Sequence, residues 1–220
     1  TMKVQVLLPK IFNYPFTYNS NSDYKIGSLV EIPFGSKKEI GVIWNNNYNE
    51  PENIKIKEIN KKTEYSINKE LINFVEWFST YNMVPLGLVL KMVIGGADKF
   101  IKKIDNKIEI KNKKIRKYAL NREQLLALKF LEKVENKFDV SVLQGTTGSG
   151  KTLVYFERLK KIIKENKQAL VLLPEIFLTN DFKSRFEDFF GFEPAVWHSK
   201  ITPKQKRIIW KGIIKNEIKI

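Results

Sequence analysis

The sequence predicts two parts of different fold class, a small β-rich module at the N-terminus and an α/β part from about residue 119. Residues 3–60 contain short strand-like runs separated by turns rich in Pro, Gly and Asn. From residue 121 onward, helical patterns alternate with short, almost continuously apolar runs. Such runs are typical of parallel strands covered by helices on both faces, so the second part is predicted to contain a parallel sheet.

The β-rich module is predicted to be a small barrel or sandwich, followed by two helices. Strand composition is found in four runs: 4–8, 29–32, 40–44 and 54–57. The apolar spacing then changes to one helical face over 67–81, and a second short helix is expected to end at Gly95. The predicted division of the chain is 1–66 for the β-rich module, 67–95 for a helical extension, 96–118 for a linker and 119–220 for the α/β part.

In the α/β part, each expected strand is followed by a helix. Helices are expected at 121–136, 153–164, 177–190 and from Thr202-Pro203 to about 215, where Thr202 supplies the N-cap. Strands are expected at 140–143, 169–173, 195–197 and from 217. The third of these helices carries four phenylalanines on one face, and we interpret them as core rather than as a platform for stacking bases: Phe182, Phe186, Phe189 and Phe190.

Charge and composition limit the classes of partner. The 220 residues carry a formal charge of +15, which favours a polyanion such as nucleic acid. Codon bias of an AT-rich genome explains the charge equally well, because the lysines are spread along the chain. There is no Cys, so these residues hold no disulfide or thiolate metal site. No apolar run approaches the roughly 20 residues of a membrane span, and the sequence predicts a soluble, cytoplasmic protein without a membrane partner.

The motif with the clearest chemistry is a phosphate-binding loop at residues 145–152. The segment fits G-x-x-x-x-G-K-S/T without a mismatch and lies between an expected strand and an expected helix. Its glycines allow backbone N–H groups to face phosphates, and the helix N-terminus favours negative charge. Lys151 is expected to contact the β- and γ-phosphates of ATP, and Thr152 to ligate Mg²⁺. The loop residues are Gly145, Thr146, Thr147, Gly148, Ser149, Gly150, Lys151 and Thr152. The alternative is a Gly-rich turn with an accidental Lys.

Two further residues, Gln124 and His198, are candidates for a ligand-binding site. Gln124 precedes the loop at a place where many superfamily 2 helicases have a glutamine that hydrogen-bonds adenine. It is also the third residue of a helix capping box that starts at Asn121, and both roles can hold together. The single histidine, His198, follows an expected strand. One His without Cys or nearby carboxylates cannot form a metal site, so we interpret it as a residue of the ligand-binding edge of the sheet.

Several motifs together resemble the PriA family of primosomal helicases. The segment from Val142 to Thr152 resembles the family's phosphate loop, and 170–179 resembles its motif Ia. The resemblance extends over nearly the whole chain. It includes Leu8-Pro9, residues 14–18, Gly27, residues 32–35 and 41–43 at the front, residues 71–87 with Trp77, Tyr81 and Pro85-Leu86-Gly87, and Arg185-Phe186, His198-Ser199, Trp210 and Gly212 near the end.

The resemblance implies an ATP-dependent 3′-to-5′ DNA helicase of replication restart. It implies a RecA-like helicase lobe 1, left incomplete, in the second part, and a front module that holds the 3′ end of a DNA strand at forks. Residues implied to bind DNA are Phe16, Thr17, Gly35 and Lys55 in the front module and Pro174, Glu175 and Thr179 in motif Ia. Primosome proteins and single-strand-binding protein are implied as partners. Zinc, the remaining catalytic carboxylates and a second lobe are implied beyond residue 220.

The chain departs from the family pattern at three places. The 24 or so residues before 119 are too few for the family's winged-helix domain, which is expected to be lost or vestigial. Thr17 replaces an aspartate that helps to recognise the 3′-terminal nucleotide, and Asn180-Asp181 replaces Pro-Gln. Two rival functions stay open, a DNA-end-binding module without catalysis and an unrelated P-loop enzyme such as a nucleotide kinase.

Overall fold

The computed structural model describes residues 2–45, 55–95, 118–133, 138–174 and 180–220. The chain divides into two compact units. The first comprises Thr1–Asn106 together with Lys200–Ile214, and the second comprises Lys107–Ser199 together with Lys215–Ile220. Of the expected linker at 96–118, the structure describes Tyr118 alone.

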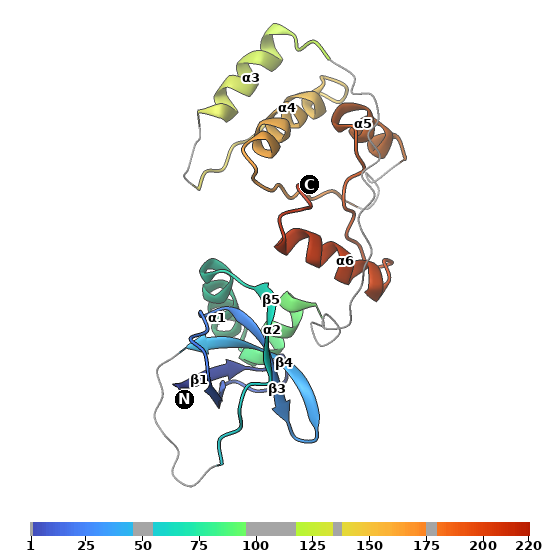
Figure 1. The fold of residues 1–220 in the computed structure, drawn as a ribbon. Coiled ribbons are helices and arrows are strands. Elements are labelled where there is room, and N and C mark those ends of the chain that lie inside the picture. Colours follow the sequence, from blue (N-terminus) through green and yellow to red (C-terminus); the bar gives the residue numbers. More distant parts are fainter. Residues whose placement is uncertain (1, 46–54, 96–117, 134–137, 175–179) are drawn as a thin grey trace. The chain divides into compact units, whose positions relative to one another are not determined.

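The first unit contains one five-stranded antiparallel sheet in the order β2-β1-β4-β3-β5. Figure 1 shows this sheet together with α1 and α2. The strands are β1 (Met2–Leu7), β2 (Phe16–Ser20), β3 (Ser28–Phe34), β4 (Lys37–Asn45) and β5 (Lys61–Ser66). The two strands that the sequence did not reveal, β2 and β5, are the edge strands. Edge strands are half exposed, so their apolar signal is weak.

The expected strand at 54–57 is not formed, and the expected barrel or sandwich is a single sheet. Residues after Lys55 instead run beside β2, where Asn19 accepts a hydrogen bond from Ile59 N–H at 3.0 Å and donates one to Lys57 at 2.9 Å. A single bridge between Asn19 and Glu58 results. The ladder with β3 is taken by β5, whose Thr63 hydroxyl also donates to the Leu29 carbonyl.

Both faces of the sheet are apolar, because side chains alternate along each strand. One face packs against helices of the unit and includes Leu7, Leu29 and Val42. The other face forms a separate cluster that includes Val6, Val30 and Ile43. Neighbouring residues of β1, β3 and β4 therefore enter different cores.

The helices α1 (Lys69–Asn82) and α2 (Leu86–Ile94) confirm the two expected after the sheet. The Asn68 side chain caps α1 by accepting a hydrogen bond from Leu71 N–H at 2.9 Å. Gly95 ends α2 in the left-handed region, with φ of 55°, as its predicted role as helix terminator requires.

The second unit contains α3 (Arg122–Glu132), α4 (Lys151–Lys164) and α5 (Asn180–Phe190). Its core is built on aromatic rings. Phe156 of α4 packs against the rings of α5, at centroid distances of 5.7 Å to Phe186, 5.3 Å to Phe189 and 5.2 Å to Phe190. The phenylalanine face of α5 is therefore core, as predicted.

The predicted parallel sheet does not appear among the described residues of this unit. The segments expected to be strands are extended but carry few mutual hydrogen bonds. Ala169 N–H donates to the Lys219 carbonyl at 2.8 Å, and Ala195 N–H donates to the Ile220 carbonyl at 3.1 Å. Val142, Leu170 and Leu172 are 82–87% exposed, where a covered parallel strand would be buried. Two isolated bonds do not make a ladder, so these residues are not strands here.

The last helix, α6 (Pro203–Ile214), belongs to the first unit although the sequence places it in the α/β part. Trp210 anchors it there. The Trp210 side chain is 9% exposed, its indole N–H donates to the Val93 carbonyl at 2.9 Å, and its ring meets Tyr65 of β5 at 6.1 Å. The chain therefore contributes one of its last elements to the core of its first module.

Candidate functional site

The residues implied to bind a DNA end lie in the edge strand β2, in the turn between β3 and β4, and in the segment before β5. Phe16 and Thr17 begin β2, the edge strand, and both are partly buried. Gly35 lies in the tight turn between β3 and β4, is exposed and has φ of 60°. A residue with a side chain is disfavoured in this region, so the turn favours Gly. Lys55 is exposed. It lies three residues before Glu58, and Phe16 lies three residues before Asn19, the residue with which Glu58 forms a parallel bridge.

Phe16 is the centre of a four-ring aromatic cluster. Its centroid lies 4.8 Å from that of Phe12, 5.3 Å from Phe34 and 5.2 Å from Tyr14. The contacts with Phe12 and Phe34 are edge-to-face, the geometry that the charge distribution of aromatic rings prefers. Phe12, Phe16 and Phe34 are partly buried against the second core of the sheet, whereas Tyr14 is 57% exposed.

The loop that carries Phe12 and Tyr14 is fixed to the N-terminus of α2. Gly87 N–H donates to the Phe12 carbonyl at 2.9 Å, and Leu86 N–H donates to the Asn13 side-chain oxygen at 3.1 Å. A Cβ at Gly87 would overlap carbonyls of this loop. The close approach explains why the Pro85-Leu86-Gly87 segment needs its glycine, and it links two motifs that are about 70 residues apart in sequence.

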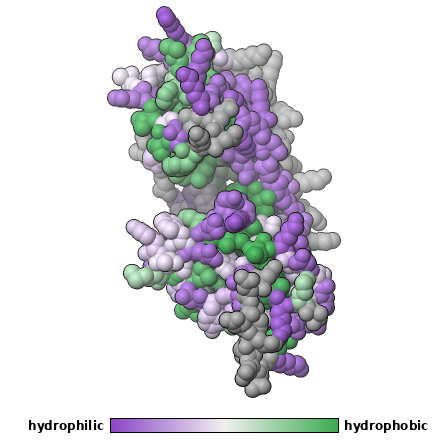
Figure 2. All heavy atoms as spheres, turned by 90° about the vertical axis from the view of Figure 1, so that its left-hand side faces the viewer, coloured by the Kyte–Doolittle hydropathy of each residue, from purple (hydrophilic) through white to green (hydrophobic). Residues whose placement is uncertain are grey.

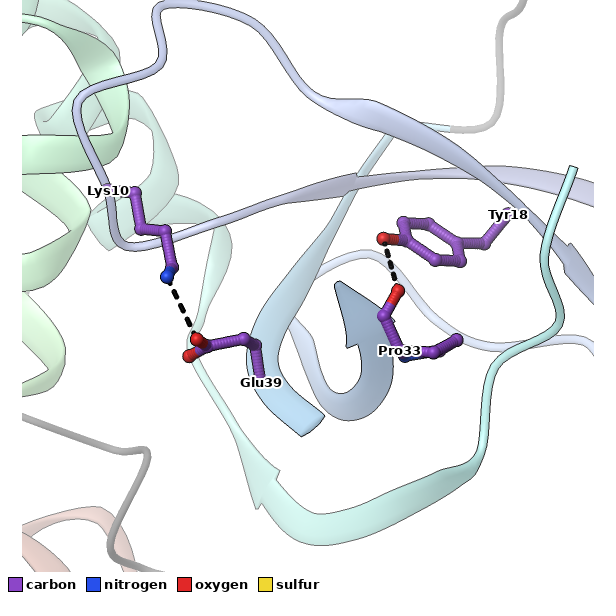
Figure 3. Close-up of polar contacts among 4 residues, drawn as sticks. All are labelled: Lys10, Tyr18, Pro33 and Glu39. Atoms are coloured by element: carbon purple, nitrogen blue, oxygen red, sulfur yellow. Dashed lines mark hydrogen bonds and ion pairs between the residues drawn. The ribbon is translucent and has the colours of Figure 1, made fainter. Parts of the chain in front are cut away.

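Two polar contacts hold the strands beside this cluster (Figure 3). Lys10 Nζ lies 2.8 Å from Glu39 Oε1 and 5.4 Å from the centre of the Phe34 ring. The Tyr18 hydroxyl donates to the Pro33 carbonyl at 3.1 Å. Burial raises the pKa of Tyr18 to about 12, so its hydroxyl keeps its proton even near pH 10, the ordinary pKa of a tyrosine.

The phosphate loop has the backbone that its motif predicts. Gly148 and Gly150 have φ of 85° and 81°, and α4 begins directly after the loop. No side chain caps the N-terminus of α4, which suits an anion. Lys151 Nζ donates to the loop's own carbonyls, at 2.6 Å to Gly145 and 2.8 Å to Thr146. A phosphate group at this loop would have to compete with these two carbonyls for the lysine.

Gln124 connects α3 to this loop. Its side-chain oxygen accepts from Asn121 N–H at 2.9 Å, completing the predicted capping box. Its amide nitrogen donates to the Ser149 carbonyl at 3.1 Å, and a Cβ at Gly150 would overlap that nitrogen. The capping role is thus confirmed. Contact with adenine stays a prediction, because both ends of the amide are engaged by the protein here.

A cavity of about 520 Å³ opens beside the loop. Thr147, Lys151 and Thr152 line it together with two residues that the sequence did not mark as site residues, Tyr118 and Arg185. Tyr118 stacks on Phe189 of α5 at 5.9 Å with an interplanar angle of 15°. No motif marks Tyr118, and Arg185 was noted only as part of the family resemblance. Sequence alone could not place Arg185 at the loop, because it reaches the cavity through the packing of α5 against α4.

The structure describes only some of the remaining predicted residues. Pro174 of motif Ia is exposed, while Glu175 and Thr179 lie outside the described residues. His198 is partly buried.

Among the residues that the structure describes, no group of acidic or His side chains could hold a metal ion. None of the described helices is long and apolar enough to cross a membrane. Figure 2 shows hydrophilic side chains over much of one face, with hydrophobic patches among them.

Comparison with known proteins joins the two sites to one family. A family model described as the 3′ DNA-binding domain of PriA matches residues 3–95, and one described as the res subunit of type III restriction enzymes matches 117–220. Replication restart protein PriA of Rickettsia felis is 35% identical over 222 residues, covering 98% of this chain. The chain belongs to the PriA family. PriA of Helicobacter pylori is 29% identical over 215 residues, and PriA of Bacillus subtilis is 40% identical over 81 residues.

The longer alignments cover nearly all of this chain but only part of each relative. The chain spans about a third of the length of the curated relatives that it matches along nearly all of its own length, 33% of the Rickettsia felis PriA and 31% of the Helicobacter pylori PriA. Most of the length of these PriA relatives therefore lies outside the aligned region.

Proposed function

We propose that this chain binds the 3′ end of a DNA strand through its front module and ATP through its phosphate loop, as part of a 3′-to-5′ DNA helicase of replication restart. The observation that carries the proposal is the occurrence in one chain of a match to the PriA 3′ DNA-binding domain and a complete phosphate loop at a helix N-terminus. Forked DNA, primosome proteins and single-strand-binding protein are the proposed partners of the whole protein.

At the DNA end, Phe16, Thr17, Gly35 and Lys55 are the proposed binding residues. An exposed turn with a glycine lets a DNA backbone approach closely, and an exposed lysine can neutralise a phosphate. Thr17 offers one hydroxyl where the family offers a carboxylate. We therefore expect weaker discrimination between a free and a blocked 3′ terminus than an acidic residue would give. Pro174, Glu175 and Thr179 are proposed to contact the backbone of a single strand, without sequence preference.

At the phosphate loop, the residues fit a nucleotide triphosphate with Mg²⁺. The loop glycines adopt positive φ, the N-terminus of α4 has no side-chain cap, and Lys151 and Thr152 line the same cavity. Lys151 would hold the β- and γ-phosphates and Thr152 the metal ion, and Gln124 would reach the base after releasing Ser149. Bound Mg²⁺ supplies charge neutralisation on the phosphates. The proposed fold around the loop is a RecA-like lobe spanning 119–220, of which α6 (Pro203–Ile214) packs with the first unit in this structure.

The experiment measures both ligands on the same purified chain. A fluorescent ATP analogue reports nucleotide binding. Anisotropy of three labelled DNAs reports end binding: a strand with a 3′-hydroxyl, a strand with a 3′-phosphate, and a circular strand without an end. We expect tighter binding to the free 3′-hydroxyl and loss of nucleotide binding in Lys151→Ala with end binding kept. Lys164→Ala, at the exposed end of the same helix, is the control and should change neither.

Equal affinity for all three DNAs would contradict the end-binding role. Parallel loss of end affinity in Lys151→Ala would contradict the division of roles between the two sites. End binding without any nucleotide binding would favour the rival function, a DNA-end-binding module without catalysis. Nucleotide binding without any DNA binding would favour the unrelated P-loop enzyme.

A further inference from the structure

The aromatic cluster of the front module has one ring that is free to meet a ligand. Phe12, Phe16 and Phe34 are partly buried and pack edge-to-face on one another, so their surfaces are largely used within the protein. Tyr14 contacts Phe16 at 5.2 Å and Phe12 at 6.1 Å, yet 57% of it is exposed. Tyr14 therefore caps the cluster from the solvent side.

Tyr14 is also held in place before any ligand arrives. The residues on either side of it are constrained. Pro15 has a fixed φ, and Asn13 accepts a hydrogen bond from Leu86 N–H of α2. Phe12, one residue further back, accepts one from Gly87. A ring held by such contacts loses little conformational entropy on binding, which favours affinity.

The position of Tyr14 matches that of the proposed DNA end. It lies two residues before Phe16 and three before Thr17, the first residues of the edge strand β2. Phe34, the ring that completes the cluster, precedes Gly35 in the exposed turn. A nucleotide held by these residues would lie beside the one aromatic ring of the cluster that is mostly exposed.

We propose that Tyr14 stacks on the base of the 3′-terminal nucleotide, and that Phe12, Phe16 and Phe34 position its ring. This inference rests on the proposed end-binding function. Every base has a π-face, so a stacking contact holds the end of a strand without reading its sequence. It adds a base contact at a site where Thr17 offers one hydroxyl. Phe16, already a proposed binding residue of the DNA end, then also positions the Tyr14 ring.

The test is a binding cycle between the residue and the base. Affinity is measured for DNA with a normal 3′-terminal nucleotide and for DNA whose terminal nucleotide is abasic but keeps its 3′-hydroxyl. Tyr14→Ala should weaken binding of the normal DNA by about 5- to 150-fold and leave binding of the abasic DNA unchanged within about two-fold. Tyr14→Phe keeps the ring and should bind like the wild type. Ile11→Ala, 70% exposed in the same loop, is the matched control and should bind like the wild type.

A second readout follows the stacking itself. With 2-aminopurine as the terminal base, binding to the wild type should lower the fluorescence of the base, and binding to Tyr14→Ala at saturating protein should lower it much less. If Tyr14→Ala weakens both DNAs equally, or if its affinity equals that of the wild type, Tyr14 does not contact the terminal base and the inference is wrong. If the wild type itself ignores the 3′ terminus, the proposed function fails first. The comparison with 3′-phosphate DNA reveals that case separately.

Discussion

Tyr18 shows how burial and a hydrogen bond act on one side chain beside the candidate DNA-end site. Its pKa of about 12 in the folded chain lies above its usual value near 10, since the charged form is disfavoured by burial. A raised pKa stabilises the folded state at every pH below about 10, and this stabilisation is lost as pH rises toward 12. Two units of pKa correspond to about 2–3 kcal/mol.

We therefore expect the free energy of unfolding of the wild type to fall by about 2 kcal/mol more than that of Tyr18→Phe between pH 10 and pH 12. The phenylalanine variant keeps the ring but has no group to ionise, and all other titrating groups are shared. Urea unfolding at several values of pH measures the difference. Parallel curves for the two proteins across this range would show that Tyr18 does not carry a raised pKa.

Gly150 and Gly148 separate two reasons for glycine in the phosphate loop. Both have φ above 80°, where an alanine costs about 1–2 kcal/mol. A Cβ at Gly150 would in addition overlap the Gln124 amide, while a Cβ at Gly148 meets open space. We expect Gly150→Ala to lower thermal stability more than Gly148→Ala, because the Gln124 amide has to move and loses its bond to the Ser149 carbonyl.

The excess cost at Gly150 should depend on Gln124. In a double-mutant cycle, Gln124→Ala should recover most of the difference between the two alanine variants, because the overlap is then gone and the strained φ remains. Thermal unfolding measures the four variants, which are Gly148→Ala and Gly150→Ala, each with Gln124 present and with Gln124→Ala. Additive effects of the two substitutions would mean that Gln124 does not lie against the loop in solution.

At the scale of elements, helix positions followed from periodicity and caps, and strand pairing did not. The expected helices begin or end at Gly95 and Asn121 as their capping chemistry requires, since caps act within a few residues. Strand pairing depends on segments far apart in the chain. For this reason β5 took the ladder with β3, and the run after Lys55 became a short bridge beside β2.

The packing of α6 gives a prediction about an element. Trp210→Ala should lower the free energy of unfolding of the first unit by about 3–5 kcal/mol, because a large buried ring and its hydrogen bond to Val93 are lost. Hydrogen exchange should quicken in α6, α2 and β5 and stay unchanged in α4 and α5. Trp197→Ala, at a half-exposed tryptophan of the second unit, should leave exchange in α6 unchanged. Unchanged exchange of α6 in Trp210→Ala would show that the helix is not anchored there.

At the scale of the whole molecule, a charge of +15 leaves open whether any particular lysine meets DNA. Salt dependence distinguishes a phosphate contact from general composition. Each contact with single-stranded DNA adds about 0.7 to the slope of log affinity against log salt. Lys55→Ala should therefore reduce that slope by about 0.7, and Lys91→Ala, an exposed lysine of α2, should leave it unchanged. Equal slopes for wild type and Lys55→Ala would remove Lys55 from the proposed site.

The sequence by itself determined the features that depend on neighbouring residues or on a complete motif. These are the β-rich front, most of the helices, the backbone conformation of the loop at 145–152, the capping role of Gln124 and the aromatic core face of α5. Each rests on chemistry within a few residues, where spacing along the chain is also spacing in space.

Tertiary structure alone decided which distant segments meet. It placed Gly87 against the loop of Tyr14, Gln124 against the phosphate loop, and Trp210 of the last helix in the core of the first unit. It left Val142 and Leu170 exposed, where the pattern of apolar residues predicted buried strands. Burial and ladder bonds need partners from elsewhere in the chain, and the order of residues does not state which partners arrive.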